Sequence, residues 1–163
     1  MSRVLVTGMG VVSSVGLGRE AFWNAIVGGH TGFSSIGSFD TNGLDRSVAG
    51  EVRGFVARDF LTHAEQKRTG RCSAFAISAA RMAVEDAGLR SEQLSGERTS
   101  VIVGTTMGEA DVITELENTW IRKGPDALNV AKIPRYGTTL LPIHLARVEE
   151  KCRYNVLRSG IWE

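Results

Sequence analysis

The residue types that could perform covalent or acid–base chemistry are few in this sequence of 163 residues. The chain contains two cysteines, Cys72 and Cys152, and three histidines, His30, His63 and His144. The two cysteines lie far apart in the sequence and do not have the spacing of a metal-binding motif, so we expect no metal site. Each cysteine lies in a helical pattern, where a cysteine is more often a small core residue than a nucleophile. We therefore assign no catalytic residue from these residue types.

Cys152 has a lysine and an arginine as its sequence neighbours, and nearby cations lower the pKa of a thiol and raise its reactivity. It also continues an apolar stripe at positions 141, 145 and 148, which predicts a helix from about residue 141 to residue 152. A cysteine on such a stripe faces a core and is unreactive. His144 falls in the same helix, where a lone histidine is usually packed or hydrogen-bonded rather than catalytic.

Two glycines near the N-terminus, Gly8 and Gly10, follow the apolar run of residues 4–6. A continuous, β-branched run is typical of a strand buried on both faces of a sheet. The glycines allow a positive φ or the close approach of another backbone. They also match part of the G-x-G-x-x-G loop of dinucleotide-binding domains, but Ser13 stands at the third glycine position, and the usual acidic residue about 20 positions further on is missing. A Rossmann-like nucleotide-binding domain is thus the less favoured alternative.

Helices alternate with strands along the rest of the chain. Residues 20–27 predict a helix that Gly28 ends, and Thr62 with Glu65 has the form of a capping box. Residues 71–87 carry a stripe of small residues and are apolar over most of the remaining circumference, which is typical of a buried helix that other backbones approach closely.

A second central strand is predicted at residues 100–104, and residues 105–108 form its exit turn. Glu109 and Asp111 then mark the start of a helix, where negative charge offsets the macrodipole. Gly124, followed by a proline, ends that helix. The alternation of strands and helices favours the α/β class.

The composition is that of an ordinary globular domain, with 42% hydrophobic and 23% charged residues, and the length favours a single domain over residues 1–163. The net charge of +1 gives no field that would attract nucleic acid or an acidic membrane. The N-terminus lacks a secretory signal pattern, and no apolar run reaches the roughly 20 residues of a membrane span. We therefore expect a cytoplasmic protein.

Three motifs carry a resemblance to a known family. They are V-x-V-T-G-x-G-V-V-S at residues 4–13, E-D-A-G-L at residues 85–89 and V-I-V-G-T-x-x-G at residues 101–108. In wording and spacing they resemble the N-terminal part of the β-ketoacyl-acyl-carrier-protein synthases, the condensing enzymes of the thiolase fold. The likeness extends over about residues 3–148 and implies the N-terminal part of a thiolase-like layered α/β/α fold. It also implies that Gly8 and Gly10 have a structural role.

The resemblance implies a transferase of fatty-acid or polyketide synthesis that works without a cofactor. Members transfer an acyl group to a cysteine, decarboxylate a malonyl thioester and form a carbon–carbon bond. The implied partners are an acyl carrier protein and ketosynthase-like chains in a homo- or hetero-oligomer. Basic residues would meet the acidic carrier protein, and the alternative is that they form a solvated face; they are Arg53, Arg58, Lys67, Arg68 and Arg71. Met107 falls where the family places an apolar residue at the acyl-chain pocket, and the alternative is that Met107 is a plain core residue.

The sequence departs from the family at its end. The T-A-C-x-x-G elbow, whose cysteine is the nucleophile, should fall near Trp162, where no cysteine stands. The family's two catalytic histidines come from its C-terminal half, and none of the three histidines here matches their motifs. We expect an N-terminal synthase segment that is inactive alone, which leaves open whether the chain itself is an enzyme. A non-catalytic ketosynthase-like partner subunit is the alternative.

Overall fold

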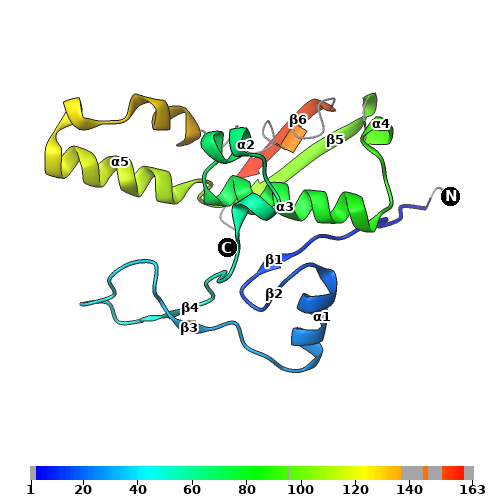
Figure 1. Ribbon diagram of the computed structural model, residues 1–163, viewed down its shortest axis with the longest axis horizontal. Helices are drawn as coiled ribbons and strands as arrows, with labels where there is room; N and C mark the ends of the chain where they lie inside the picture. Colours follow the sequence, from blue (N-terminus) through cyan, green and yellow to red (C-terminus); the bar gives the residue numbers. More distant parts are fainter. Residues whose placement is uncertain (1–2, 95, 137–144, 147–151, 160–163) are drawn as a thin grey trace. The chain divides into compact units, whose positions relative to one another are not determined.

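The computed structural model describes residues 3–94, 96–136, 145–146 and 152–159, and its fold is α/β (Figure 1). The chain forms two compact units. The first combines Met1–Val56 with Ala79–Gly88, and the second combines Ala57–Ser78 with Leu89–Glu163. The long helix α3, Arg71–Asp86, contributes its first half to the second unit and its second half to the first. The expected single domain over residues 1–163 stays a prediction.

The first unit begins with a small antiparallel hairpin of β1, Val12–Ser13, and β2, Gly16–Leu17. The Ser13 hydroxyl closes the hairpin, because it accepts a hydrogen bond from the Gly16 N–H at 3.1 Å and donates one to the Gly16 carbonyl at 2.9 Å. Helix α1, Arg19–Val27, follows and ends at Gly28, as predicted. A second antiparallel pair joins β3, Ser34–Ser35, to β4, Val48–Ala49.

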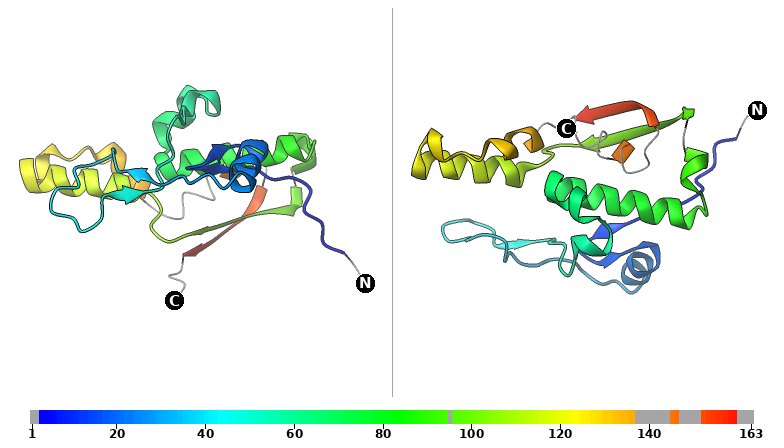
Figure 2. Two further views of the ribbon diagram at one scale, coloured as in Figure 1. Left: turned by 90° about the horizontal axis from the view of Figure 1, so that it is seen from below. Right: turned by 45° about the horizontal axis from the view of Figure 1, so that its top comes forward.

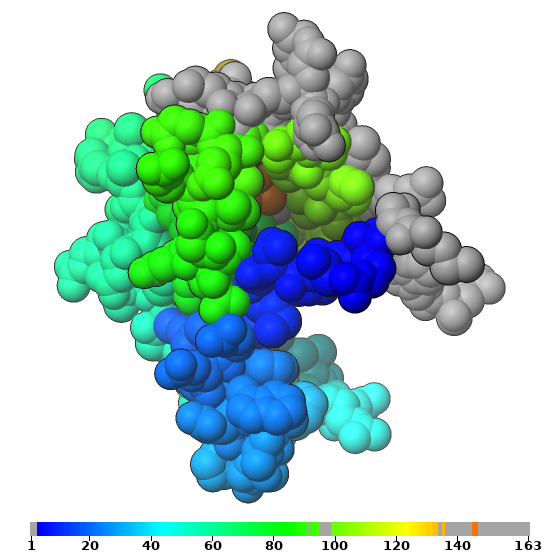
Figure 3. Space-filling view, turned by 90° about the vertical axis from the view of Figure 1, so that its right-hand side faces the viewer, coloured from blue at the N-terminus to red at the C-terminus, as the bar shows by residue number. Residues whose placement is uncertain are grey.

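The backbone at Gly8 and Gly10 lies directly against the second half of α3. Figure 3 shows the N-terminal segment, in dark blue, beside the green atoms of α3. A Cβ atom on Gly8 would lie 2.1 Å from the Ala83 carbonyl oxygen, and one on Gly10 would lie 1.8 Å from the Ala79 carbonyl oxygen. Neither glycine has a positive φ. Of the two predicted reasons for these glycines, close backbone approach is therefore the one that applies, and the small-residue stripe of α3 is the surface that they approach.

Asp86, the last residue of α3, stabilises the contact between the glycine segment and this helix. Its Oδ2 accepts a hydrogen bond from the Met9 N–H at 3.0 Å, and its Oδ1 pairs with the Arg19 guanidinium at 2.8 Å. One carboxylate therefore holds the glycine segment, the start of α1 and the end of α3 together.

The apolar run of residues 4–6 does not form the predicted buried strand. Its backbone has no strand partner among the described residues, and the side chains of Val4, Leu5 and Val6 are 98%, 75% and 82% exposed. A β-branched run is suited to the inside of a sheet, but it is buried only where other strands and helices cover it.

The second unit contains the parallel pair of β5, Gly96–Thr105, and β6, Cys152–Ser159, which lie side by side in all views (Figures 1 and 2). β5 confirms the predicted second strand, and Val101 is in register with Asn155. The other helical elements are short except for α5, and they are η1, Ala57–Asp59; α2, His63–Arg68; α4, Ser91–Leu94; α5, Ala110–Lys123; η2, Pro125–Ala127; and η3, Val130–Tyr136.

Two helix starts and stops in this unit match the sequence patterns. The capping box at α2 is complete, since the Thr62 hydroxyl accepts from the Glu65 N–H and a Glu65 carboxylate oxygen accepts from the Thr62 N–H at 2.7 Å. Helix α5 ends at Gly124, whose φ is 82°. The buried apolar side chains of the unit come from several elements, and they are Leu61, Ala74, Ile77, Val112 and Ala146.

The helix predicted from about residue 141 to residue 152 is wrong at its end, because Cys152 begins strand β6. Residues 152–156 alternate between apolar and polar types, which is the period of a strand, and parallel pairing to β5 satisfies their backbone. Leu145 and Ala146 are helical. The remaining positions of the predicted helix, His144 among them, lie outside the described residues.

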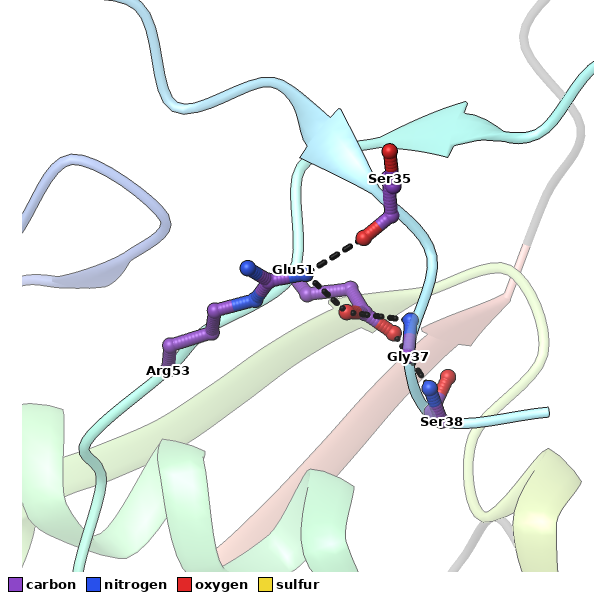
Figure 4. A network of polar contacts seen from close by, with 5 residues as sticks. All are labelled: Ser35, Gly37, Ser38, Glu51 and Arg53. Atoms are coloured by element: carbon purple, nitrogen blue, oxygen red, sulfur yellow. Dashed lines mark hydrogen bonds and ion pairs between the residues drawn. The ribbon is translucent and has the colours of Figure 1, made fainter.

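Glu51 anchors the loop between β3 and β4 (Figure 4). Its carboxylate accepts hydrogen bonds from the N–H groups of Gly37 and Ser38, both at 3.0 Å, and pairs with the Arg53 guanidinium at 3.1 Å. The Ser38 hydroxyl, the Gly37 N–H and Arg53 all favour the charged form and lower the pKa of Glu51 to about 2.

We predict that Gly10→Ala destabilises the chain by about 1–3 kcal/mol, because the new methyl group overlaps the Ala79 carbonyl and the backbones must separate. Far-ultraviolet circular dichroism during thermal unfolding measures the effect. Gly37→Ala is the matched control, since its Cβ would meet nothing closer than 3.7 Å. Equal unfolding temperatures for the two variants would show that the glycine contact does not hold the fold.

We also predict that Glu51 titrates near pH 2 in an NMR titration of the side-chain carboxyl groups. Because the folded pKa lies below the ordinary value of 4.5, the loop contacts stabilise the fold fully above that value. That stabilisation is lost as the pH falls through the folded pKa. Ser38→Ala should raise the pKa of Glu51, since it removes the hydroxyl group that contributes most to lowering that pKa. An ordinary carboxyl pKa in both proteins would refute this account of the loop.

Candidate functional site

The exit turn of β5, residues 105–108, presents an apolar side chain at the carboxyl end of a parallel strand. The turn is closed by the Thr105 hydroxyl, which accepts a hydrogen bond from the Gly108 N–H at 3.0 Å, and Gly108 has a φ of 58°. Met107 lies in this turn and is 63% exposed. Ligands of open α/β sheets commonly bind at the carboxyl ends of the strands. The turn is therefore a position at which a ligand could contact the described chain.

Glu109 follows the turn directly, and its side chain is buried, with an exposed fraction of 2%. Its carboxylate accepts hydrogen bonds from the N–H groups of Cys72 at 3.0 Å and Ser73 at 2.8 Å. The first N–H groups of a helix have no partner within the helix, so Glu109 supplies the missing acceptors at the start of α3. Its negative charge also offsets the positive end of the α3 dipole.

Gly70 precedes α3 and leaves room for this carboxylate. A Cβ atom on Gly70 would lie 2.3 Å from Glu109 Oε2. The residue before the helix thus has no side chain, and a side chain from a distant part of the sequence caps the helix. The sequence pattern predicts for Glu109 only a place at the start of α5, where its side chain makes no capping hydrogen bond. The contact between Glu109 and α3 could have been suspected from the sequence, because α3 follows a glycine and no capping side chain stands beside its start.

Cys72 lies beside Glu109 and is partly buried. Burial raises the pKa of its thiol, the charge of Glu109 raises it further, and a hydrogen bond with the Thr105 side chain acts in the opposite direction. A thiol with a raised pKa carries little thiolate at neutral pH and is a poor nucleophile. Cys72 therefore has the character of a structural cysteine.

The two described histidines, His30 and His63, are exposed. Within the described ranges, no group of three or more His, Cys, Asp or Glu residues could hold a metal ion. In the same part of the chain, no helix is both long and apolar enough to cross a membrane.

The second unit carries several basic residues on and near α2. Arg58 of η1 and Lys67 and Arg68 of α2 are exposed, and the Arg71 guanidinium lies over the Phe75 ring at 4.8 Å from its centroid. Arg135 donates a hydrogen bond to the Lys67 carbonyl and adds a further cation. Exposed cations of this kind favour contact with an acidic partner.

The family model of the beta-ketoacyl synthase N-terminal domain matches residues 1–137. Among curated proteins, the chain is 32% identical over 132 residues to 3-oxoacyl-(acyl-carrier-protein) synthase 2 of Synechocystis sp., which covers 81% of this chain and 32% of that protein. It is 31% identical over 150 residues to the chloroplastic 3-oxoacyl-(acyl-carrier-protein) synthase I of Arabidopsis thaliana, covering 88% of this chain and 32% of that protein. The chain thus spans about a third of the length of these relatives.

Solved structures of ketosynthases are also similar to this chain. The ishigamide ketosynthase/chain length factor superposes with a TM-score of 0.89 at 32% identity, covering 94% of this chain and 39% of that chain. A type II PKS acyl-carrier protein in complex with its ketosynthase bound to the hexaketide superposes with a TM-score of 0.70 at 25% identity, covering 93% of this chain and 36% of that chain.

We predict that iodoacetamide labels Cys72 more slowly in the folded chain than in the chemically unfolded chain at neutral pH. The reason is that the raised thiol pKa lowers the thiolate fraction and partial burial restricts access. Mass spectrometry of the peptide that contains Cys72 gives the rate against pH. Equal rates in both states would mean that Cys72 is a reactive thiol and would reopen the question of a nucleophile.

Proposed function

The chain belongs to the β-ketoacyl synthase family, and we propose that it supplies the N-terminal part of a synthase that condenses acyl and malonyl thioesters. The family match over residues 1–137 carries this proposal. In the proposed reaction, an acyl group held as a thioester is attacked by the carbanion that loss of carbon dioxide from a malonyl thioester generates. The new carbon–carbon bond replaces the carbon–sulfur bond of the acyl group, and a thiolate leaves.

In this proposal, Met107 forms part of the wall of the acyl-chain pocket. Three observations support the role: the side chain is apolar, it is largely exposed, and it lies in a closed turn at the carboxyl end of β5. An apolar wall favours an acyl chain because burying methylene groups from both partners removes them from water. In this proposal the acylated cysteine belongs to another part of the synthase, because the T-A-C-x-x-G elbow of the family has no counterpart near Trp162.

We further propose an acyl carrier protein as the partner that delivers the substrates in the cytoplasm. The basic side chains of Arg58, Lys67 and Arg68 support this, because they are exposed on one unit and would attract an acidic protein. One of the similar solved structures is itself a ketosynthase in complex with an acyl-carrier protein.

A second candidate is a non-catalytic ketosynthase-like subunit that pairs with an active one. The likeness to a ketosynthase/chain length factor assembly favours this candidate, since that assembly contains two kinds of chain. A nucleotide-binding domain lacks comparable support. The side of Gly8 and Gly10 that a dinucleotide loop would turn to a pyrophosphate is filled by the α3 backbone.

The test compares the 163-residue chain with a complete synthase that contains it, each incubated with acyl- and malonyl-carrier protein. We predict a β-ketoacyl product from the complete synthase and none from the chain alone, because a covalent mechanism without its nucleophile has no path to the acyl-enzyme. Product from the chain alone would refute the proposed division of roles. A complete synthase that makes product only when mixed with a second ketosynthase chain would favour the non-catalytic subunit.

Replacing Met107 by Phe in the complete synthase should shorten the acyl chains that it accepts, because the larger ring fills part of a close-packed pocket. We predict that kcat/KM for a long acyl primer falls about tenfold or more relative to a short one, the scale of discrimination that a pocket wall achieves. Met107→Leu, which nearly conserves volume, is the control and should leave the ratio unchanged. An equal loss on long and short primers would instead indicate a core defect.

A further inference from the structure

Glu109 joins two elements that the sequence separates by more than thirty residues. Its backbone is the N-cap of α5 and directly follows the exit turn of β5. Its side chain reaches the N-terminus of α3 and accepts the Cys72 and Ser73 N–H groups. The turn that carries Met107 is therefore fixed on one side by its own strand, β5, and on the other by the attachment of Glu109 to α3.

The attachment leaves the turn little freedom. The Glu109 side chain is almost completely buried, so its two hydrogen bonds do not compete with water. Gly108, between Met107 and Glu109, is held by its own hydrogen bond to the Thr105 hydroxyl. A shift of Met107 along the pocket would therefore have to break the Gly108 bond, the two Glu109 bonds, or both.

We propose that Glu109 is a positioning residue that holds the Met107 turn against α3 and thereby sets the acyl-chain length that the pocket accepts. This inference rests on the proposed function, because it requires Met107 to line the acyl pocket. Glu109 itself touches no substrate in this account. Its effect on the accepted chain length comes from fixing the position of Met107.

The role requires a carboxylate rather than any polar side chain. Two N–H groups point at the two oxygens of Glu109, and a carboxylate has only acceptors. A glutamine of the same shape can offer one oxygen but must turn its NH2 group toward the other N–H, which leaves a buried donor without an acceptor. Glu109→Gln therefore changes the side-chain volume little but removes one of the two hydrogen bonds that join Glu109 to α3.

The chain offers a matched control and a second route to the same defect. Glu117→Gln makes the same chemical change on the same helix, at a side chain that is exposed. Gly70→Ala leaves Glu109 intact but puts a methyl group where its carboxylate lies, 2.3 Å from Oε2. If the hydrogen bonds between Glu109 and α3 hold the turn, Gly70→Ala and Glu109→Gln should have the same effects on hydrogen exchange and on chain-length preference. Glu117→Gln should behave like the unsubstituted protein.

The first measurement is hydrogen exchange of the 163-residue chain, which does not depend on the proposed function. Glu109→Gln and Gly70→Ala should speed exchange about tenfold or more at the amides of Cys72 and Ser73 and also at Gly108. Faster exchange at Cys72 and Ser73 with an unchanged Gly108 would overturn the inference, because Glu109 would then cap α3 without holding the turn.

The second measurement is the ratio of kcat/KM for long and short acyl primers in the complete synthase. Glu109→Gln and Gly70→Ala should change this ratio about tenfold, whereas a merely structural defect lowers both values equally and would overturn the inference. The unsubstituted synthase separates the two hypotheses. If the unsubstituted synthase makes no β-ketoacyl product, the proposed function fails. Hydrogen exchange at Gly108 then tests by itself whether Glu109 holds the turn.

Discussion

Contact between backbones is the constraint on which this structure depends. Helix α3 contributes residues to both units, and in the first unit the chain at Gly8 and Gly10 lies so close to it that no Cβ atom would fit. Such an approach works only when both surfaces are small, which explains why glycines on one side meet alanines on the other. Asp86 then fixes the direction of the approach through the Met9 N–H and Arg19.

Features that depend on a few neighbouring residues could be predicted from the sequence. The capping box at Thr62, the stops of helices at Gly28 and Gly124 and the position of β5 all follow from local hydrogen bonding or from a hydrophobic pattern. The small-residue stripe of α3 also predicted close packing correctly. For the capping box, the two helix stops and β5, the residues that decide the structure lie within about one helical turn of one another or within one strand.

Features that depend on distant partners could not be predicted. Residues 4–6 have the composition of a buried strand, yet burial requires covering elements, and none pairs with them in the described chain. Cys152 ends a helical apolar spacing at 141, 145 and 148 and also begins an alternation of apolar and polar residues that is typical of a strand. The pairing of β6 with β5 decides between the two. Glu109 shows the same limit, because its sequence neighbours suggest the start of α5 while its carboxylate caps α3.

A comparison of Glu51 with Glu109 shows why the second is the better candidate for an effect on function. Both carboxylates accept two backbone N–H groups, but Glu51 ties a loop to residues 14 or fewer positions away. Glu109 ties residues 36 and 37 positions away and is buried. Hydrogen bonds between residues that are close in the sequence stabilise only their own loop. Buried hydrogen bonds between residues that are distant in the sequence determine where one element lies against another. In this chain, the element so fixed is the turn that presents Met107.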